Sequence, residues 1–412
     1  MKKMGWDVSR RVFLKGAGLA VLGIGTQPSS LIVRAAEGAP VGGRIFVHLF
    51  LRGGADPLNM VVPYGDHEYY DARGEIAIPP PGKPGGAVAL DDHFGFHPGL
   101  APLKPLYADG RLAIVYGVGN YSVTRSHFSA QDFAELGTPG VRTTTTGTLA
   151  RMVGSLPGSG VTKAVSFSSQ SPVSLLGPDE ALVALKLKAF RLRAKNWQSE
   201  AERRVKAMYT GTPLSRLGDD LFDALGIVQT VLERSGEPAS GIVYPDSPIG
   251  NAMRQAAQVI KAGVGTRCIF CGVSGVGDYD SHARQLERNA IDFPDIGATL
   301  AAFEKDLGPR MDHVVVLVTT EFGRTVAVNG SMGSDHGTGY LALVLGGGVK
   351  GGRIHGQWPG LAKHQLYEER DLAVTTDFRD LFAEVAGKHL GLSPTSTLFP
   401  GYTPASVPGI LA

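Results

Sequence analysis

Cysteine is scarce in this chain, because among its 412 residues only Cys268 and Cys271 carry a thiol. Both stand in the apolar run TRCIFCGV, which predicts a buried strand. Side chains three residues apart in a strand point to opposite faces, so this pair is unsuited to a disulfide or to shared metal ligation. We therefore predict two buried structural thiols rather than a redox or metal-binding CxxC element.

Basic charge is also scarce once the first 35 residues are set aside. The whole chain has a formal net charge of +2, and its first 35 residues hold six lysines and arginines against one aspartate, so the remainder carries −3. That remainder has no stripe of basic residues of the kind that neutralises a phosphate backbone. We therefore expect no nucleic-acid partner.

The N-terminus lacks a long apolar run. Residues 16–25 form an apolar run only about half as long as the roughly 20 residues that a membrane-spanning helix needs. Two lysines and the motif SRRVFLK, with Arg10 and Arg11, precede that run. This layout is typical of a secretory signal, and the arginine pair indicates the twin-arginine route. A membrane anchor is the competing interpretation, and the short run argues against it.

A cleavage site follows the apolar run. The segment VRA at residues 33–35 places small residues at the positions that a signal peptidase requires. We predict that residues 1–35 are a signal peptide and that the mature chain begins near Ala36. The twin-arginine translocase is then the partner during export, and the mature protein is periplasmic or secreted without a permanent membrane anchor.

Two common catalytic templates are missing or incomplete. No GxSxG elbow occurs anywhere in the chain, which argues against an α/β-hydrolase. Gly346, Gly348 and Gly351 match GxGxxG after a predicted strand, but the sequence that follows does not open a helix. A dinucleotide-binding interpretation therefore lacks the structural context that it requires.

Short apolar runs without polar alternation predict strands that are covered on both faces of a sheet. These runs span residues 44–51, 112–118, 268–273, 314–320 and 341–345. Helical patterns lie between and after them, at residues 98–110, 128–136, 251–262, 291–306 and 378–388. The alternation predicts a single α/β domain over residues 36–412, built as a three-layer sandwich with a mainly parallel sheet. Residues 199–235 are helical and charged, which predicts a helical insertion in that domain.

Polar residues gather where these strands end, and open parallel sheets bind their ligands at that edge. The first strand leads into RGGADPLN with Asp56, and the second leads into a predicted helix start with Thr124, Ser126 and His127. Two later strands lead into GVGDYDSHARQ and EFGRTVAVNGSMGSDHGTG. Each residue alone has a structural explanation as a cap or turn residue, but four such strand ends together indicate a site. Mixed carboxylate and imidazole ligands suit zinc, manganese or iron better than calcium.

A set of motifs runs in order from about Arg44 to Gly387. They are FLRGGADPLNMVVPYGDHEYY, HPGLAPLKPLYADGRLAIVYGVGN, RSHFSAQD, GDYDSH, and TTEFGRT followed by GSDHGTG. Together they resemble the bacterial family catalogued as domain of unknown function 1501. That family is often exported by the twin-arginine route and is grouped with the alkaline phosphatase and sulfatase superfamily, so the resemblance implies an alkaline-phosphatase-like fold.

The resemblance also implies a two-metal site with a Ser or Thr nucleophile at a helix start. Ser126 or Thr124 would stand near the nucleophile position, and Arg324 would hold an anionic oxygen of the substrate. Glu321 would be a further metal ligand or would support one, and Asp278 could replace Asp280 in a pair with His282. The implied metal ligands are Asp56, Asp280, His282, Asp335 and His336.

Two functions remain open at this stage. The leading hypothesis is an exported, metal-dependent hydrolase of phosphate or sulfate esters, which takes a small anionic ester and uses divalent metal ions, zinc or manganese above all. The rival is a noncatalytic periplasmic binding or assembly protein that retains the fold, since fold alone does not prove activity.

Overall fold

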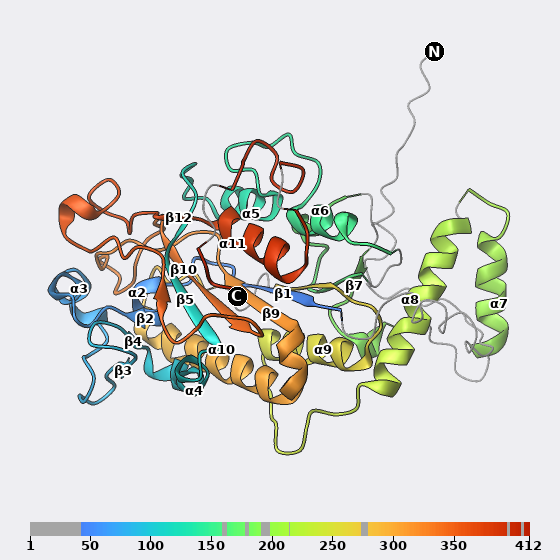
Figure 1. Cartoon of the computed structure of the whole chain (residues 1–412), viewed down its shortest axis with the longest axis horizontal. Helices are drawn as coiled ribbons and strands as arrows, with labels where there is room; N and C mark the ends of the chain where they lie inside the picture. Colours follow the sequence, from blue (N-terminus) through green and yellow to red (C-terminus); the bar gives the residue numbers. More distant parts are fainter. Residues whose placement is uncertain are drawn as a thin grey trace, which may run out of the picture.

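The computed structural model describes residues 43–158, 163–177, 181–190, 198–213, 215–272, 279–393, 396–404 and 408–412. The predicted signal peptide at residues 1–35 and Asp278 lie outside this described part. A sheet of nine described strands forms the centre of the molecule, and helices lie on both of its faces (Figure 1). None of the described helices has the length and apolar character needed to cross a membrane.

The central sheet is mainly parallel. Its strand order is β11-β5-β10-β9-β1-β8-β6-β7, with β12 alongside β5. Among the described strands of this sheet, only β10 is antiparallel to its neighbours, β5 and β9. The predicted α/β class is therefore confirmed, and each of the five predicted strands forms. The bounds are β1 Ile45–Phe50, β5 Leu112–Gly119, β6 Ala164–Phe167, β7 Leu182–Val183, β8 Cys268–Gly272, β9 Val314–Thr319, β10 Tyr340–Gly346, β11 Ile354–His355 and β12 Thr376–Asp377.

Each face of the sheet carries its own hydrophobic core. Successive side chains of a strand point to opposite faces, so Val47 and Leu49 of β1 enter one core while Phe46 and Phe50 enter the other. Burial of one such side chain contributes about 1.5–3 kcal/mol. Two cores of this kind fix the strands and therefore the positions of the strand ends.

The two cysteines of β8 follow the same alternation. Cys271 lies in the first core and Cys268 in the second, and both are free and buried. Burial raises the pKa of the Cys268 thiol to about 12. The prediction of buried structural thiols is confirmed, because these uncharged thiols face opposite sides of the sheet.

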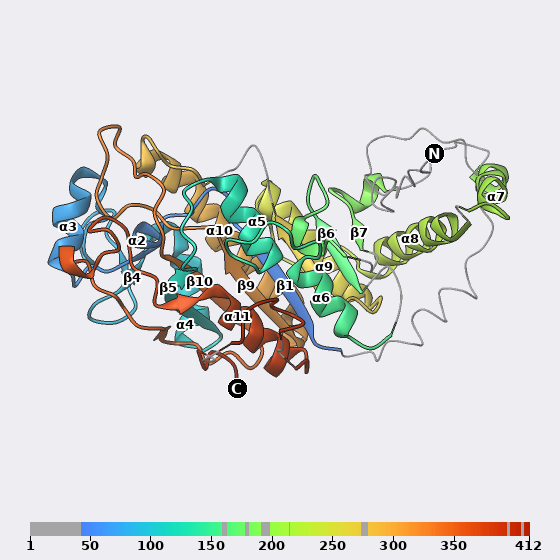
Figure 2. The ribbon, with the colours of Figure 1, turned by 90° about the horizontal axis from the view of Figure 1, so that it is seen from above.

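Helices complete the three layers (Figures 1 and 2). One face is covered by α4 Lys104–Ala108, α9 Pro248–Ala262 and α10 Gln285–Leu307, and the other by α5 His127–Leu136, α6 Thr148–Ser155 and α11 Phe378–Glu384. The 3-10 helix Pro98–Leu103 precedes α4 and packs against α10. The predicted three-layer sandwich is thus present.

Helix α10 begins six residues before its predicted start at residue 291. Arg284 at its N-cap has a left-handed backbone, with φ 47°, and its side chain forms no capping hydrogen bond. The first turns are polar, because only one side of the helix faces the core there. A start without a capping side chain and without apolar periodicity gives the sequence no signal to detect.

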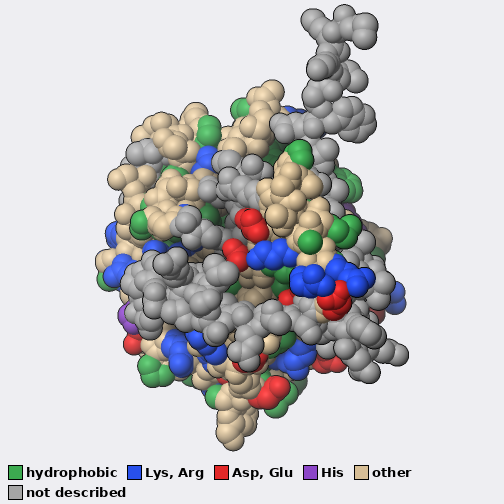
Figure 3. All heavy atoms as spheres, turned by 90° about the vertical axis from the view of Figure 1, so that its right-hand side faces the viewer, with side chains coloured by type: hydrophobic (Ala, Val, Ile, Leu, Met, Phe, Trp, Pro, Cys, Tyr) green, Lys and Arg blue, Asp and Glu red, His purple; other side chains and the backbone are tan. Residues whose placement is uncertain are grey.

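Residues 199–235, predicted to be helical, contain two helices, α7 Gln198–Tyr209 and α8 Ser215–Arg234, at one end of the long axis (Figure 1). Figure 3 faces that end and shows basic and acidic side chains on the same surface. On α7, Glu200 accepts a hydrogen bond of 2.6 Å from Arg204. Such exposed pairs contribute little to stability, because water screens their charges.

Candidate metal centre

The candidate site lies at the edge where the parallel strands have their carboxyl ends. β1 leads there into Gly53, β9 leads towards Glu321, and β5 leads into the loop before α5. β10 runs in the opposite direction, so its first residues lie at the same edge. This orientation explains why His336, which precedes a strand, meets residues that follow strands.

Four side chains converge at this edge. His127, Asp280 and His336 each offer one ligand atom, and these three atoms lie within 4.8 Å of one another. The Nε2 atom of His282 lies 2.8 Å from Nε2 of His336 and 3.2 Å from Oδ1 of Asp280. The predicted residues Asp280, His282 and His336 are therefore brought together, and His127 joins them.

The three imidazoles are held in the same tautomer. Each Nδ1 faces an oxygen that can only accept a hydrogen bond: Oε1 of Glu321 at 2.6 Å from His127, the Arg125 carbonyl at 2.7 Å from His336, and Oδ1 of Asp335 at 2.9 Å from His282. Each Nδ1 must therefore donate, which leaves the lone pair of a neutral imidazole on Nε2. Metal-binding histidines have this arrangement, with an oxygen acceptor behind the ring.

The Nε2 atoms of the three imidazoles lack a full set of hydrogen-bond donors among the described residues. Nε2 of His127 is buried and lies 3.3 Å from Oδ2 of Asp280, without a hydrogen bond to any described residue. The Nε2 atoms of His282 and His336 face each other at 2.8 Å, which is unfavourable unless a proton or a cation lies between lone pairs. The cluster therefore fits a metal site, because one cation would satisfy all of these atoms.

The electrostatics of the cluster favour positive charge. Burial alone would raise the pKa of Asp280, but its imidazole and guanidinium neighbours outweigh burial and hold that pKa well below the usual range. Burial alone would lower the pKa of His127, but the carboxylates of Asp280 and Glu321 raise it to about 9. An anionic Asp280 beside rings that attract protons is a favourable environment for a divalent cation.

Glu321 supports the cluster from behind. Its carboxylate accepts hydrogen bonds from the Gly53 N–H at 2.8 and 3.1 Å and from the Thr320 hydroxyl at 2.8 Å, in addition to His127. A Cβ on Gly53, whose φ is 118°, would lie 2.4 Å from the backbone nitrogen of Tyr279, so only glycine fits this turn. Of the two roles left open for Glu321, these contacts fit the supporting one, because its carboxylate faces Nδ1 of His127.

Asp335 also supports the cluster rather than entering it. Its Oδ1 accepts hydrogen bonds from His282 at 2.9 Å and from the Asn329 amide at 3.1 Å. The hydrogen bond from His282 lowers the pKa of Asp335, and half of the side chain is exposed. Of the implied metal pair, His336 therefore belongs to the cluster, whereas Asp335 lies behind His282.

Arg324 lies beneath the cluster, with no exposed side-chain surface. It donates to the carbonyl oxygens of Gly53, Gly54 at 2.7 Å and Ser334 at 3.0 Å, and to Oδ1 of Asp280 at 2.6 Å. The expectation that Arg324 holds an anionic substrate oxygen does not match this position, because its guanidinium is buried among protein acceptors. Its guanidinium contacts Asp280 instead.

Asp56 lies outside the cluster. Its carboxylate accepts from Arg73 Nη1 at 2.6 Å, from Arg73 Nη2 at 2.9 Å and from the Gln285 amide at 2.5 Å. It also caps helix α2, Pro57–Met60, by accepting from the Leu58 N–H at 3.2 Å. The resemblance implied that Asp56 is the metal ligand after the first strand. Asp56 instead forms a fully buried ion pair with Arg73, and both of its oxygens already accept hydrogen bonds within the chain.

The two candidate nucleophiles stand directly before α5. Ser126 is the N-cap residue, but its hydroxyl makes no capping hydrogen bond, and the residue is exposed. The Thr124 hydroxyl accepts from the Ser126 N–H at 3.4 Å, near the limit for a hydrogen bond. Neither hydroxyl is committed to holding the helix, and Ser126 adjoins the cluster residue His127.

His127 is the one cluster residue to which the sequence analysis gave no role. Its ring packs against Phe322 and His336, with ring centroids 4.8 and 4.2 Å away. The available signal was its place in RSHFSAQD at a helix start that follows a strand. That signal was too weak, because its partner Glu321 is distant in sequence and is recognised only in the folded chain.

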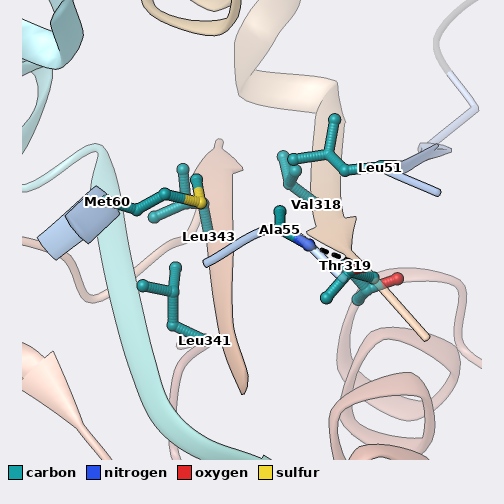
Figure 4. Close-up of a pocket in the computed structure, with 8 residues that line it drawn as sticks. Leu51, Ala55, Met60, Val318, Thr319, Leu341 and Leu343 are labelled. Atoms are coloured by element: carbon teal, nitrogen blue, oxygen red, sulfur yellow. Dashed lines mark hydrogen bonds between the residues drawn. The ribbon is translucent and has the colours of Figure 1, made fainter. Parts of the chain in front are cut away.

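A small cavity lies at the carboxyl ends of β1 and β9, and none of the cluster residues lines it (Figure 4). It measures about 10 Å³, and its lining is apolar apart from Thr319 and Thr320. The Thr320 hydroxyl is already engaged by the Ala55 N–H at 3.3 Å. The space is at the lower limit for one water molecule, so it holds no substrate.

Comparison with known proteins places the chain in a family. The family model described as "Protein of unknown function (DUF1501)" matches residues 44–398. Among solved structures, the chain is similar to the PsFucS1 sulfatase from Pseudoalteromonas sp., with a TM-score of 0.36 and 12% identity over 89% of this chain and 72% of that chain. It is also similar to a 2-O GAG sulfatase, with a TM-score of 0.31 and 11% identity over 88% and 76% of the two chains. No curated protein matches the sequence. The chain belongs to the DUF1501 family.

Proposed function

We propose that this chain is a metal-dependent hydrolase of phosphate or sulfate esters that works outside the cytoplasm. The observation that carries the proposal is the convergence of three Nε2 atoms on the Asp280 carboxylate, at 3.2 to 3.5 Å, from imidazoles whose Nδ1 atoms each face an oxygen acceptor. His127, His282, His336 and Asp280 would hold the ion, and such a donor set suits zinc or manganese.

The bound ion would supply Lewis acidity towards an anionic ester oxygen. The chain supplies the remaining functions through its own groups. Glu321 and Asp335 keep two imidazoles in the metal-binding tautomer, and Arg324 keeps Asp280 in place. This support fixes the centre before substrate arrives, so that binding energy is not spent on reorganisation.

Ser126 is the proposed nucleophile, with Thr124 as the alternative. Its oxygen would attack the phosphorus or sulfur atom and form an ester with the protein, while the bond to the substrate alcohol breaks and the alcohol leaves with the serine proton. Water would then hydrolyse that ester, release inorganic phosphate or sulfate and restore the serine hydroxyl. The uncommitted hydroxyl of Ser126 and its position next to His127 support this assignment.

Turnover of an aryl phosphate and an aryl sulfate by mature, metal-loaded protein tests the proposal. We expect Ser126→Ala to lower kcat by several orders of magnitude while the ion stays bound, and Thr124→Ala to have a small effect. Reversed effects would move the nucleophile to Thr124. Bound metal without turnover of either ester would refute the hydrolase.

A noncatalytic binding or assembly role is the second candidate, and one observation favours it. The arginines around the cluster already have protein partners: Arg324 binds backbone carbonyls, and Arg125 binds Glu368 at 2.7 Å and Asp371 at 2.9 Å. An anionic ester would therefore depend on the metal ion for its charge compensation. Retained metal together with no turnover is the outcome expected for this role.

Export by the twin-arginine translocase is a separate part of the proposal. It rests on SRRVFLK and the short apolar run at residues 16–25. Replacement of Arg10 and Arg11 together by lysine is expected to leave precursor in the cytoplasm, as fractionation and immunoblotting would show. Unchanged periplasmic protein would contradict this route.

A further inference from the structure

We propose that Asp371 is a positioning residue for the candidate metal centre and that it fixes His336 through two arginines. This inference rests on the proposed metal centre, and it does not depend on which reaction the centre performs. The side chain of Asp371 has no exposed surface, and its two oxygens are bound by different arginines.

The first arm of this arrangement reaches the ring of His336. Oδ2 of Asp371 accepts from Arg125 Nη2 at 2.9 Å, and the carbonyl of Arg125 accepts from Nδ1 of His336 at 2.7 Å. Arg125 therefore holds the imidazole through its main chain while Asp371 holds Arg125 through its side chain. If this carbonyl moved, Nδ1 would lose the acceptor that sets the tautomer of His336.

The second arm reaches the backbone of the same histidine. Oδ1 of Asp371 accepts from Arg370 Nη1 at 2.9 Å, and the same Nη1 donates to the carbonyl of His336 at 3.1 Å. One buried carboxylate thus controls both the ring and the main chain of His336. Two points of attachment fix where Nε2 points, which a single hydrogen bond would not do.

The turn that carries Asp371 is held in a fixed shape. The N–H of Tyr367 donates to the Asp371 carbonyl at 2.9 Å, and the N–H of Asp371 donates to the Tyr367 carbonyl at 3.0 Å. Between them, Glu368 and Glu369 adopt left-handed backbones with φ of 52° and 53°. Such backbones persist in non-glycine residues only where surrounding contacts impose them. This turn therefore gives Asp371 a rigid base from which to hold the two arginines.

Titration of Co²⁺ into metal-free mature protein tests the inference, because visible absorption reports ligand geometry as well as affinity. Asp371→Asn keeps the shape of the side chain but removes its charge, and we expect it to raise the Kd for Co²⁺ by about 10- to 100-fold and to change the absorption spectrum. Arg125→Met replaces a partly exposed side chain, and we expect it too to raise the Kd for Co²⁺ and to change the absorption spectrum.

Asp377→Asn is the matched control. Asp377 is also a buried aspartate paired with an arginine, Arg379, at 2.7 Å, but that arginine contacts no residue of the cluster. We expect both Asp377→Asn and Asp371→Asn to lower the melting temperature of the metal-free protein. Only Asp377→Asn should keep the wild-type Kd for Co²⁺ and the wild-type absorption spectrum.

The outcomes separate this inference from the proposed function. Wild-type Kd and spectrum in a folded Asp371→Asn variant would overturn it, and if that variant does not fold, the same result for Arg125→Met would do so. Wild-type protein that binds no Co²⁺ would overturn it together with the metal centre. Co²⁺ binding that both variants weaken, without ester turnover, would support this inference and refute only the hydrolase.

Discussion

Two polar clusters lie at the same edge of the sheet, and they are completed in opposite ways. In the first, Asp56 has both oxygens bound by Arg73 and Gln285, and no side-chain surface of the ion pair is exposed. In the second, Asp280 faces three imidazoles: Nε2 of His127 has no hydrogen-bond partner among the described residues, and Nε2 of His282 and Nε2 of His336 face each other at 2.8 Å. The first cluster is complete within the protein, whereas we propose that a cation from solution completes the second.

The comparison shows that a place at a strand end does not decide what an aspartate does. Asp56 and Asp280 both follow parallel strands, but Asp56 meets a guanidinium that offers two donors at once. Asp280 also meets a guanidinium, that of Arg324, which binds only one of its oxygens. That oxygen, Oδ1, also lies 3.2 Å from Nε2 of His282, and the other oxygen, Oδ2, lies 3.3 Å from Nε2 of His127. Function at this edge therefore depends on how many donors each carboxylate receives from its own chain.

The largest expected effect is loss of the metal ion when the incomplete cluster loses its charge. Substitution of a residue that only supports a metal ligand typically weakens affinity by roughly 10- to 100-fold. We expect Asp280→Asn to weaken Zn²⁺ affinity by more than that, because it removes the anion that all three imidazoles share. Calorimetric titration of metal-free protein measures this. Asp109→Asn, at an exposed helix end, is the control. Equal affinity in both variants would remove Asp280 from the centre.

The complete cluster is expected to respond in stability instead. Asp56→Ala leaves the buried Arg73 without its partner, which typically costs about 3–5 kcal/mol of unfolding free energy. Metal affinity should stay unchanged, because Asp56 contacts none of the four converging side chains. Urea denaturation and metal titration of the same variant measure the two quantities. A stable variant that loses metal would reverse the assignment of the two clusters.

A double variant sharpens this result. Asp56→Leu with Arg73→Met removes both charges, and such replacements of a buried pair are often neutral or stabilising. We expect it to recover most of the stability lost in Asp56→Ala. If it remains as unstable as the single variant, the polar contacts of Gln285 and the cap on α2 contribute more than the ion pair.

A smaller effect is expected behind the ligands. Asp335→Asn weakens the acceptor for Nδ1 of His282, and because the side chain is half exposed we expect about a 10-fold loss of Zn²⁺ affinity, near the lower end for such changes. Asp312→Asn, at another exposed aspartate, is the control for surface charge. A loss as large as that of Asp280→Asn would make Asp335 a direct ligand, as the family resemblance implied.

The sequence predicted the parts of the molecule that depend on local pattern. Apolar runs predicted the five central strands, and the polar residues after them located the edge that carries Asp280, His282 and His336. The partners of these residues were not predictable. Arg73 reaches Asp56 and Glu321 reaches His127 only after folding, and no spacing in the chain records those contacts.

Direction within the sheet was also hidden from the sequence. An apolar run gives the same signal in either orientation, so nothing marked β10 as antiparallel. Its orientation brings His336 to the site edge, whereas the polar residues before a parallel strand would lie at the opposite edge. The candidate residues could therefore be found from the sequence, but their roles could be assigned only from the fold.

The central claim is that a metal ion completes the cluster of His127, Asp280, His282 and His336. The most direct test is elemental analysis of mature protein purified from the periplasm without added metal, followed by Zn²⁺ and Mn²⁺ titration of chelator-treated protein. We expect about one equivalent of a transition metal, zinc or manganese, per chain, and re-uptake after chelation. Native protein that contains no metal and takes up neither ion would contradict the account.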